Sequence, residues 1–204
     1  MPLPLILAST SPYRKAILTR LGLNVSAHAP DYDERPIEGL DPIACVLAHG
    51  RNKALSLRTR FQDRIIIGSD QGLRFEQTLL GKPHTFDAAC QQLAAMQGKT
   101  AQLITSLAVL PPPPYDIQTH IDITTLHFRP LTNTEIQHYI LADQPLDCAG
   151  SFKIESRGPL LFEAIETRDP TAIEGIPCMA LCRFLAEIEK NTHTSLLFAP
   201  KTQD

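Results

Sequence analysis

One short run of the sequence constrains the fold more than any other: three consecutive isoleucines, residues 65–67, followed by Gly68-Ser69-Asp70-Gln71. Successive side chains in a strand point to opposite faces, so consecutive β-branched apolar residues are typical of a strand buried on both faces. Such a strand needs helices on both sides of its sheet. We therefore predict an α/β fold in which residues 65–67 form a central strand and Gly68-Ser69-Asp70-Gln71 lies at its C-terminal end.

The segments around this run alternate between strand-like and helix-like patterns. Strands are predicted at residues 3–8, 23–28, 100–110 and 119–128. Helices are predicted from a Ser11 cap to Gly22, over 41–58 after Asp41-Pro42, over 85–96, over 132–142 from a capping box, and over 177–189. Alternating strands and helices with some adjacent strand pairs indicate a mixed sheet flanked by helices.

Four consecutive prolines at 111–114 interrupt the pattern between two of these strands. Proline cannot continue a strand ladder, and we interpret this segment as the tip of a hairpin rather than a domain linker. With 204 residues, of which 43% are hydrophobic, the chain is expected to form one domain over residues 1–190, followed by a polar tail over 191–204.

Charge and cysteine usage exclude several classes of function. The formal net charge is −3 and the basic residues are scattered, so no long nucleic-acid partner is expected and any phosphate binding must be local. No apolar run approaches membrane-spanning length and the N-terminus lacks a basic signal region, which predicts a cytoplasmic protein without membrane contact. The five cysteines form no CxxC pair and are expected to be structural.

Common catalytic motifs are also missing from the sequence. The seven histidines show no zinc-binding spacing, and there is no P-loop, no GxGxxG and no GxSxG elbow. The remaining candidates are carboxylates and separate phosphate-binding groups.

The first candidate is the turn Ser9-Thr10-Ser11-Pro12-Tyr13-Arg14. It offers hydroxyls, backbone N–H groups at a helix N-terminus, and the forked guanidinium of Arg14, all of which suit an anion. From these residues alone, a capped helix with a solvated Arg14 is the simpler interpretation.

Two carboxylates form the second candidate. Asp70 follows a very apolar strand, where a carboxylate is costly unless it is paired, solvated or bound to a metal; the alternative is an aspartate that caps a turn. Glu34, in an acidic loop, could join it in holding a divalent cation, although a solvated acidic loop is an equal alternative. Lys53 and Lys82 are candidate point charges for phosphates, or ordinary surface lysines.

Taken together, these segments resemble a known family, the Maf nucleotide pyrophosphatases. The matching motifs, in order, are Ala8-Ser9-Thr10-Ser11-Pro12-x-Arg14, Asp33-Glu34, Lys53-Ala54, Gly68-Ser69-Asp70-Gln71, Gly81-Lys82-Pro83 and Ala149-Gly150-Ser151-Phe152. The resemblance runs from residue 5 to about residue 188, and its ordered motifs are far more specific together than singly.

The resemblance implies hydrolysis of a nucleoside triphosphate between its α- and β-phosphates, with a divalent cation such as Mg²⁺ or Mn²⁺ and often a homodimer. It implies a mixed elongated β-sheet flanked by helices in two lobes, as in inosine triphosphate pyrophosphatases. It makes Asp70 the proton acceptor and Glu34 and Asp70 the residues near the metal. Ser11, Arg14, Lys53 and Lys82 match positions around the triphosphate.

Within the family, the chain looks like the branch that acts on 7-methyl-GTP, which limits the incorporation of modified nucleotides into nucleic acids. Base discrimination is then assigned to Tyr13, Gln71 and Glu155: an aromatic face suits a cationic methylated base, and Glu155 could accept hydrogen bonds from guanine. A dTTP/UTP pyrophosphatase and a non-catalytic nucleotide-binding regulator of cell division are the alternatives.

The sequence departs from the family pattern at Ala48, at Tyr13 and at Gly72-Leu73-Arg74-Phe75, which replaces a more apolar strand continuation. Ala48 stands where an arginine is usual, and Arg51, one turn away, is expected to substitute for it in part. Position 13 is tyrosine where tryptophan is common.

Overall fold

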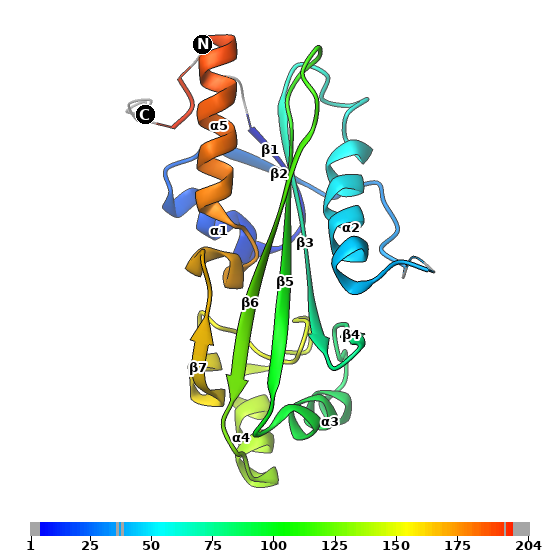
Figure 1. The fold of residues 1–204 in the computed structure, drawn as a ribbon, viewed down its shortest axis with the longest axis vertical. Helices are drawn as coiled ribbons and strands as arrows, with labels where there is room; N and C mark the ends of the chain where they lie inside the picture. The colour runs from blue at the N-terminus through cyan, green and yellow to red at the C-terminus, as the bar shows by residue number, and fades with distance from the viewer. Residues whose placement is uncertain (1–4, 36, 38, 194, 198–204) are drawn as a thin grey trace. The chain divides into compact units, whose positions relative to one another are not determined.

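The computed structural model describes residues 5–35, 37, 39–193 and 195–197. Over these residues, one sheet has the strand order β2-β1-β3-β5-β6-β7, and β4 also pairs with β3 (Figure 1). The strands are β1 (Leu5–Ala8), β2 (Val25–His28), β3 (Ile65–Phe75), β4 (Thr78–Leu80), β5 (Thr100–Leu110), β6 (Gln118–Phe128) and β7 (Phe162–Glu166). The helices are α1 (Pro12–Arg20), α2 (Pro42–Ser56), α3 (Phe86–Met96), α4 (Asn133–Asp143) and α5 (Cys178–Thr192), with short 3-10 helices η1 (Gly158–Leu161) and η2 (Pro170–Glu174).

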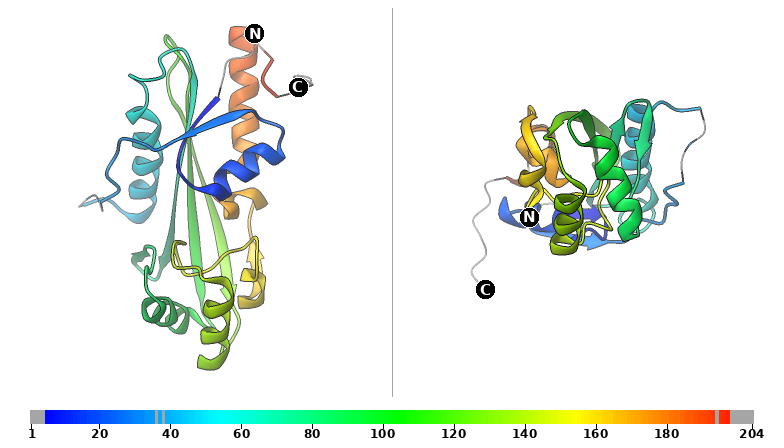
Figure 2. Two further views of the ribbon diagram at one scale, coloured as in Figure 1. Left: turned by 180° about the vertical axis from the view of Figure 1, so that it is seen from behind. Right: turned by 90° about the horizontal axis from the view of Figure 1, so that it is seen from below.

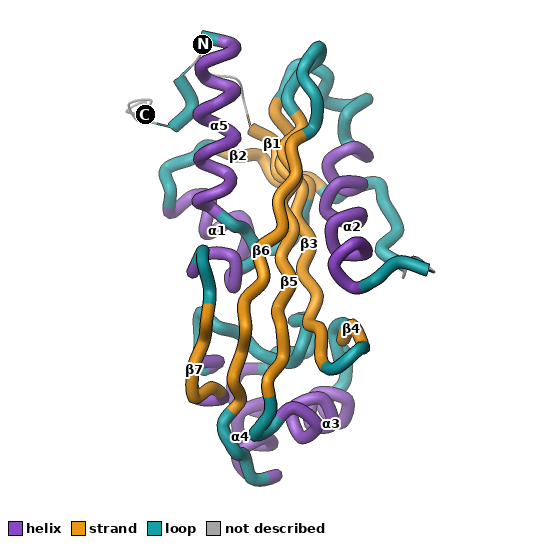
Figure 3. The backbone as a smooth tube through the Cα atoms, viewed as in Figure 1, coloured by secondary structure: helices purple, strands orange, loops and turns teal. Residues whose placement is uncertain are grey.

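The chain divides into two compact units. The first contains the described residues of Met1–Asp70, Thr105–Ile121 and Asp169–Asp204, and the second contains Gln71–Ile104 and Asp122–Arg168. Strands β3, β5 and β6, which Figure 3 distinguishes by colour from the helices and loops, each contribute residues to both units.

Both faces of the sheet in the first unit are covered, as the isoleucine run predicts. Helix α2 lies on one face and α1 and α5 lie on the other (Figures 1 and 2). Ile66 packs with Ala54 and Leu57 of α2, whereas Ile65 and Ile67 pack with the α1 and α5 side. Strand β1 pairs in parallel with both β2 and β3, so the predicted mixed α/β fold is confirmed.

Local signals placed most of the boundaries correctly. Ser11 and Asp41 cap α1 and α2 with a proline at the first helical position, and α4 carries the predicted capping box of Thr132 and Glu135. Thr85 caps α3. Strands β5 and β6 are neighbours in the sheet joined through the proline segment, which confirms the hairpin.

One prediction about β3 is wrong: the strand does not end before Gly68, but continues through Asp70 to Phe75. What ends at Ile67 is its parallel pairing with β1, whose last register partner is Leu7. The polar residues remain in the strand because Ser106 of the neighbouring strand β5 accepts the Asp70 N–H and β4 pairs with residues 73–75.

The C-terminal region also differs from expectation. Helix α5 ends at Thr192 rather than Glu189, and Glu189 accepts backbone hydrogen bonds from Leu196 and Leu197. Leu196 is buried in the α5 core, so the first part of the tail predicted to be polar is packed. The rest of that tail, residues 198–204, lies outside the described residues.

The second unit contains two strands that the sequence pattern did not reveal. Strand β4 folds back on β3 in antiparallel register, with Phe75 opposite Thr78, and β7 pairs in antiparallel register with β6. Helices α3 and α4 contact each other in this unit. Gly150, at φ +75°, lies so close to Leu73 that an added Cβ would be 2.4 Å from its side chain.

Candidate active site

The turn that follows β1 in the first unit is a helix cap that also positions Arg14. Ser11 Oγ accepts the Arg14 N–H at 3.4 Å, and Ser9 Oγ lies 3.4 Å from Arg14 Nη1. Burial lowers the pKa of the Arg14 guanidinium below its usual value, while the carboxylates of Asp70 and Glu34 oppose that shift. Arg14 is therefore not the solvated side chain of the alternative interpretation, but a partly desolvated cation close to two acids.

A glycine that the sequence analysis missed lies against this arginine. Gly175 follows η2 at φ +106°, and a Cβ added to it would be 3.1 Å from Arg14 Nε. Ser69, which is fully buried, donates its hydroxyl to the Gly175 carbonyl at 2.6 Å. The glycine itself was the detectable signal, since glycine adopts a positive φ without strain, but the contact with Arg14 joins segments far apart in the sequence.

The centre of the candidate site is Lys53. Its side chain is only 4% exposed, and its Nζ lies 2.6 Å from Asp70 Oδ1 and 2.9 Å from Glu34 Oε2. A buried ammonium needs such partners because an unpaired charge is costly to desolvate. The alternative of a surface lysine is thus wrong for Lys53, and Asp70, inside β3, does not cap a turn.

Two glycines bring Lys53 to Asp70. A Cβ added to Gly68 on β3 would be 2.3 Å from the Gly50 carbonyl oxygen and 2.9 Å from Ala54 of α2. A Cβ added to Gly50 would be 2.3 Å from Ser106 Oγ. Helix α2 consequently packs close to the sheet. This brings the side chain of Lys53, in the last turn of the helix, to Asp70 on β3.

The backbone of Asp70 is fixed by a buried serine on β5. Ser106 Oγ donates to the Val46 carbonyl of α2 at 2.8 Å and accepts the Asp70 N–H at 3.0 Å. One hydroxyl therefore ties α2, β3 and β5 together beside the carboxylate. Nothing in the sequence around Ser106 indicated this role, because its partners come from two other elements.

The carboxylates fit a divalent cation. Glu34 and Asp70 both contact a single ammonium, so the two can approach one positive centre, and carboxylate oxygens are ligands that Mg²⁺ prefers. Asp70 is 13% exposed and Glu34 is 49% exposed, which leaves access for a cation that takes further ligands from water or phosphate. Within the described ranges, no cluster of three or more His, Cys, Asp or Glu side chains is arranged to hold a metal by itself.

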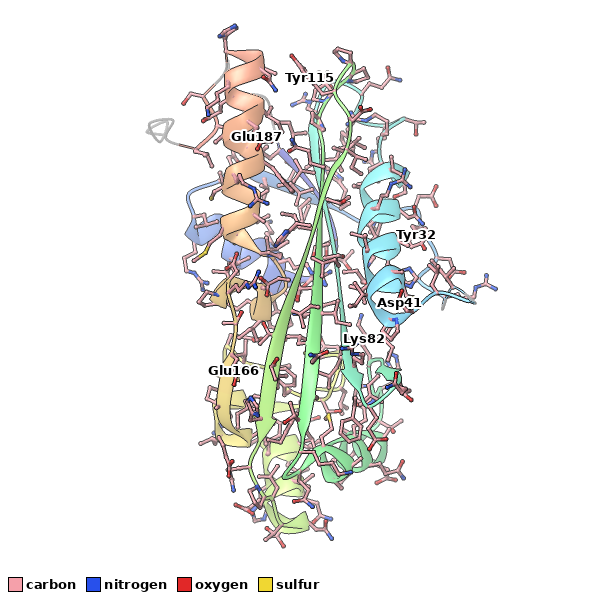
Figure 4. The ribbon with its side chains drawn as sticks, in the orientation of Figure 1. Tyr32, Asp41, Lys82, Tyr115, Glu166 and Glu187 are labelled. Carbon is pink, nitrogen blue, oxygen red and sulfur yellow. The ribbon has the colours of Figure 1, made fainter. Side chains whose placement is uncertain are left out.

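The other sequence-predicted residues are divided between the two units. Tyr13 is half-buried on α1 of the first unit. Gln71, Lys82 and Glu155 belong to the second unit: Gln71 is half-buried on β3, Lys82 (labelled in Figure 4) is exposed after β4, and Glu155 is exposed in the loop before η1. In the first unit, the structure brings together Arg14, Glu34, Lys53 and Asp70. Arg51 is exposed on α2, and its proposed substitution for the missing arginine at Ala48 stays a prediction.

The fold and these contacts define an α/β protein in which cationic and carboxylate side chains gather beside β3. They lie just beyond the point at which β3 stops pairing with β1. The chain belongs to the Maf-like protein family, whose model matches residues 4–188. A 7-methyl-GTP pyrophosphatase of Bdellovibrio bacteriovorus is 44% identical over 186 residues, which cover 89% of this chain and 95% of that protein.

Two solved structures resemble the chain at low sequence identity. The Staphylococcus aureus Ham1 protein gives a TM-score of 0.49 at 13% identity, over 91% of this chain and 99% of its own. A Vibrio cholerae protein gives 0.46 at 11% identity, over 96% and 100% of the two chains. No helix in the described part of the chain has the length and apolarity needed to cross a membrane.

Proposed function

We propose that this protein hydrolyses a nucleoside triphosphate, with 7-methyl-GTP as its substrate, to the nucleoside monophosphate and pyrophosphate. The observation that carries the proposal is the placement of the Lys53 ammonium between Asp70 and Glu34, with Arg14 close by. Such a cluster can hold an anionic substrate and a water molecule near one carboxylate. The family and the 44% identical relative support the same reaction.

In the proposed mechanism, Asp70 accepts the proton of the attacking water. Lys53 holds the Asp70 carboxylate in place at 2.6 Å, and Ser106 holds its backbone, so the base is oriented before the substrate arrives. Water attacks the α-phosphorus in line, the bond to the bridging oxygen breaks, and pyrophosphate leaves. Arg14 and Lys82 are proposed to neutralise negative charge on the phosphate chain, with the Ser11 turn binding a phosphate oxygen.

A divalent cation, Mg²⁺ or Mn²⁺, would be held by Glu34 and Asp70 and would supply charge neutralisation on the triphosphate. For Asp70 and Glu34 to bind it, the Lys53 ammonium must share these carboxylates or turn toward the phosphates. The flexible four-carbon stem of lysine permits such a movement.

Base selection is assigned to Tyr13, Gln71 and Glu155. N7-methylguanine is cationic, so the face of a tyrosine ring attracts it, and a carboxylate can accept from its N1–H and amino group. Replacing Gln71 with leucine should reduce kcat/KM for the guanine substrate more than for dTTP or UTP.

The proposal extends to the setting of the reaction. All five cysteines are free, which suits the reducing cytoplasm, where the enzyme would remove modified nucleotides before their incorporation into nucleic acids. A homodimer is expected from the family resemblance, and the molar mass in solution, measured by light scattering, tests it.

The decisive experiment incubates the purified protein with Mg²⁺ and a panel of nucleotides that includes 7-methyl-GTP, GTP, dTTP and UTP. Pyrophosphate release fastest with 7-methyl-GTP is expected, with Asp70→Asn inactive. Asp63→Asn is the matched control, because the Asp63 side chain is 81% exposed and pairs with its neighbour Arg64. Release of orthophosphate, or full activity of Asp70→Asn, would refute the mechanism, and preference for dTTP or UTP would reassign the substrate.

A further inference from the structure

The acidic loop that carries Glu34 is attached to one face of α2. Four residues of the helix contact the loop: His49, Asn52, Lys53 and Ser56. Their spacing of three, four and seven residues places them on one side of a helix. In the loop, Asp31 N–H donates to Ser56 Oγ at 3.1 Å and Glu34 pairs with Lys53 at 2.9 Å. Between these two contacts lies Tyr32 (labelled in Figure 4).

Tyr32 is half-buried and is held by a chain of hydrogen bonds that leads into the buried face of α2. Its hydroxyl lies 2.9 Å from His49 Nδ1, and Asn52 Nδ2 donates to the same hydroxyl oxygen at 3.3 Å. His49 Nε2 in turn lies 3.3 Å from Cys45 Sγ, and both His49 and Cys45 are buried. Because Asn52 donates to the tyrosine oxygen, the tyrosine keeps its own proton to donate to Nδ1, and the His49 tautomer protonated on Nε2 fits both contacts of the ring.

Among the described residues, little else holds Glu34 in place. Its side chain is 49% exposed, and Arg35, the next residue, pairs locally with Asp33 at 2.6 Å and is itself 85% exposed. An exposed carboxylate on an unanchored loop loses conformational entropy when it binds a cation or an ammonium. The Tyr32–His49–Cys45 chain, whose His49 and Cys45 members are buried, supplies the anchor two residues before Glu34.

We propose that Tyr32 and His49 are positioning residues, which hold the loop on α2 so that the Glu34 carboxylate stays beside Lys53 and Asp70. The consequence for metal-dependent turnover rests on the proposed function, whereas the anchoring of the loop does not. Loss of the Tyr32 hydroxyl should raise the Mg²⁺ concentration at half-maximal rate about fivefold, which corresponds to the net contribution of one hydrogen bond. The rate at saturating Mg²⁺ should be unchanged, because Asp70 keeps its own contacts.

The test uses two readouts on the full chain. The protein contains no tryptophan, so Arg35→Trp introduces a single fluorescent reporter into the loop, and its anisotropy decay measures loop motion without reference to activity. Tyr32→Phe and His49→Ala are made in this background and alone. His49→Asn keeps an acceptor near the Nδ1 position and serves as the conservative rescue. Tyr115→Phe is the control, because it removes an exposed tyrosine hydroxyl that donates to the Asn191 carbonyl, away from the acidic loop.

Tyr32→Phe and His49→Ala should increase the motion of the reporter and raise the Mg²⁺ requirement, whereas Tyr115→Phe should change neither, and His49→Asn should restore most of the anchoring. Unchanged anisotropy decay in both Tyr32→Phe and His49→Ala would overturn the proposal. A fall in kcat at saturating Mg²⁺ without any change in anisotropy decay would also overturn it. If the wild-type protein releases no pyrophosphate, the proposed function fails, and the anisotropy measurement still decides whether the two residues anchor the loop.

Discussion

Replacing Gly68 with alanine tests how α2 is held against the sheet. The added Cβ would lie 2.3 Å from the Gly50 carbonyl oxygen and 2.9 Å from the Ala54 backbone nitrogen, so backbone must move. To reach ordinary contact distances, α2 must shift by about 1 Å, and such overpacking costs about 2 kcal/mol. For a chain of this length that corresponds to a fall in Tm of about 4–8 °C.

The same shift should separate Lys53 from Asp70, which are now 2.6 Å apart. A displacement of about 1 Å in a catalytic group can cost on the order of 100-fold in rate. Thermal unfolding followed by circular dichroism and pyrophosphate release from 7-methyl-GTP measure the two effects. Gly81→Ala is the matched control, because nothing lies within 4 Å of a Cβ built there. If Gly68→Ala matched Gly81→Ala in both Tm and rate, the close approach of α2 would not determine the site.

Three further predictions follow from individual side chains. Lys53→Met should lower the free energy of unfolding by about 2–3 kcal/mol, since it leaves Asp70 without its buried partner, and Mg²⁺ should raise the Tm of this variant more than that of the wild type. Hydrogen bonds from the Thr132 N–H and hydroxyl lower the pKa of Glu135 to about 2 from its ordinary 4.5. Its stabilising effect is therefore complete above about pH 4.5 and lost as the pH falls toward 2, so acid unfolding curves of Glu135→Ala and the wild type should converge over this range. Burial, with a smaller contribution from Asp147, raises the pKa of Cys148 to about 12, so mass spectrometry should find this thiol unmodified after brief treatment with iodoacetamide at pH 8.

Most helices and strands were predictable because their signals are local. Ser11 with Pro12, and Thr132 with Glu135, satisfy backbone groups within one turn of each helix, and the structure places both caps as expected. The isoleucine run indicated two covered faces for the same reason, since a strand alternates its side chains.

The strands that escaped prediction depend on distant partners. Thr78–Leu80 has too few residues for a periodic pattern and forms a strand only because β3 extends to meet it. Phe162–Glu166 pairs with β6, which lies more than thirty residues earlier in the chain. Tertiary pairing of this kind decides strand formation more than intrinsic preference does.

The candidate site likewise combines residues that the sequence identifies with residues whose roles depend on distant partners. Lys53 and Asp70 were recognisable by residue type and by family resemblance, but the burial of Lys53 follows from the absence of side chains at Gly50 and Gly68. Ser106 has partners on two other elements, and no short motif records them. Sequence therefore identified the charged groups, whereas the residues that orient them required coordinates.

The placement of α5 has a consequence for synthesis of the protein on the ribosome. Leu5, Leu7 and Ile17 near the start of the chain share a core with Leu181 and Leu185 of this last described helix. Translation delivers β1 and α1 long before α5, so this apolar face of β1 and α1 lacks its α5 cover until the residues from 178 onward have emerged. Nascent chains stalled before residue 178 should therefore be substrates for chaperones and proteases.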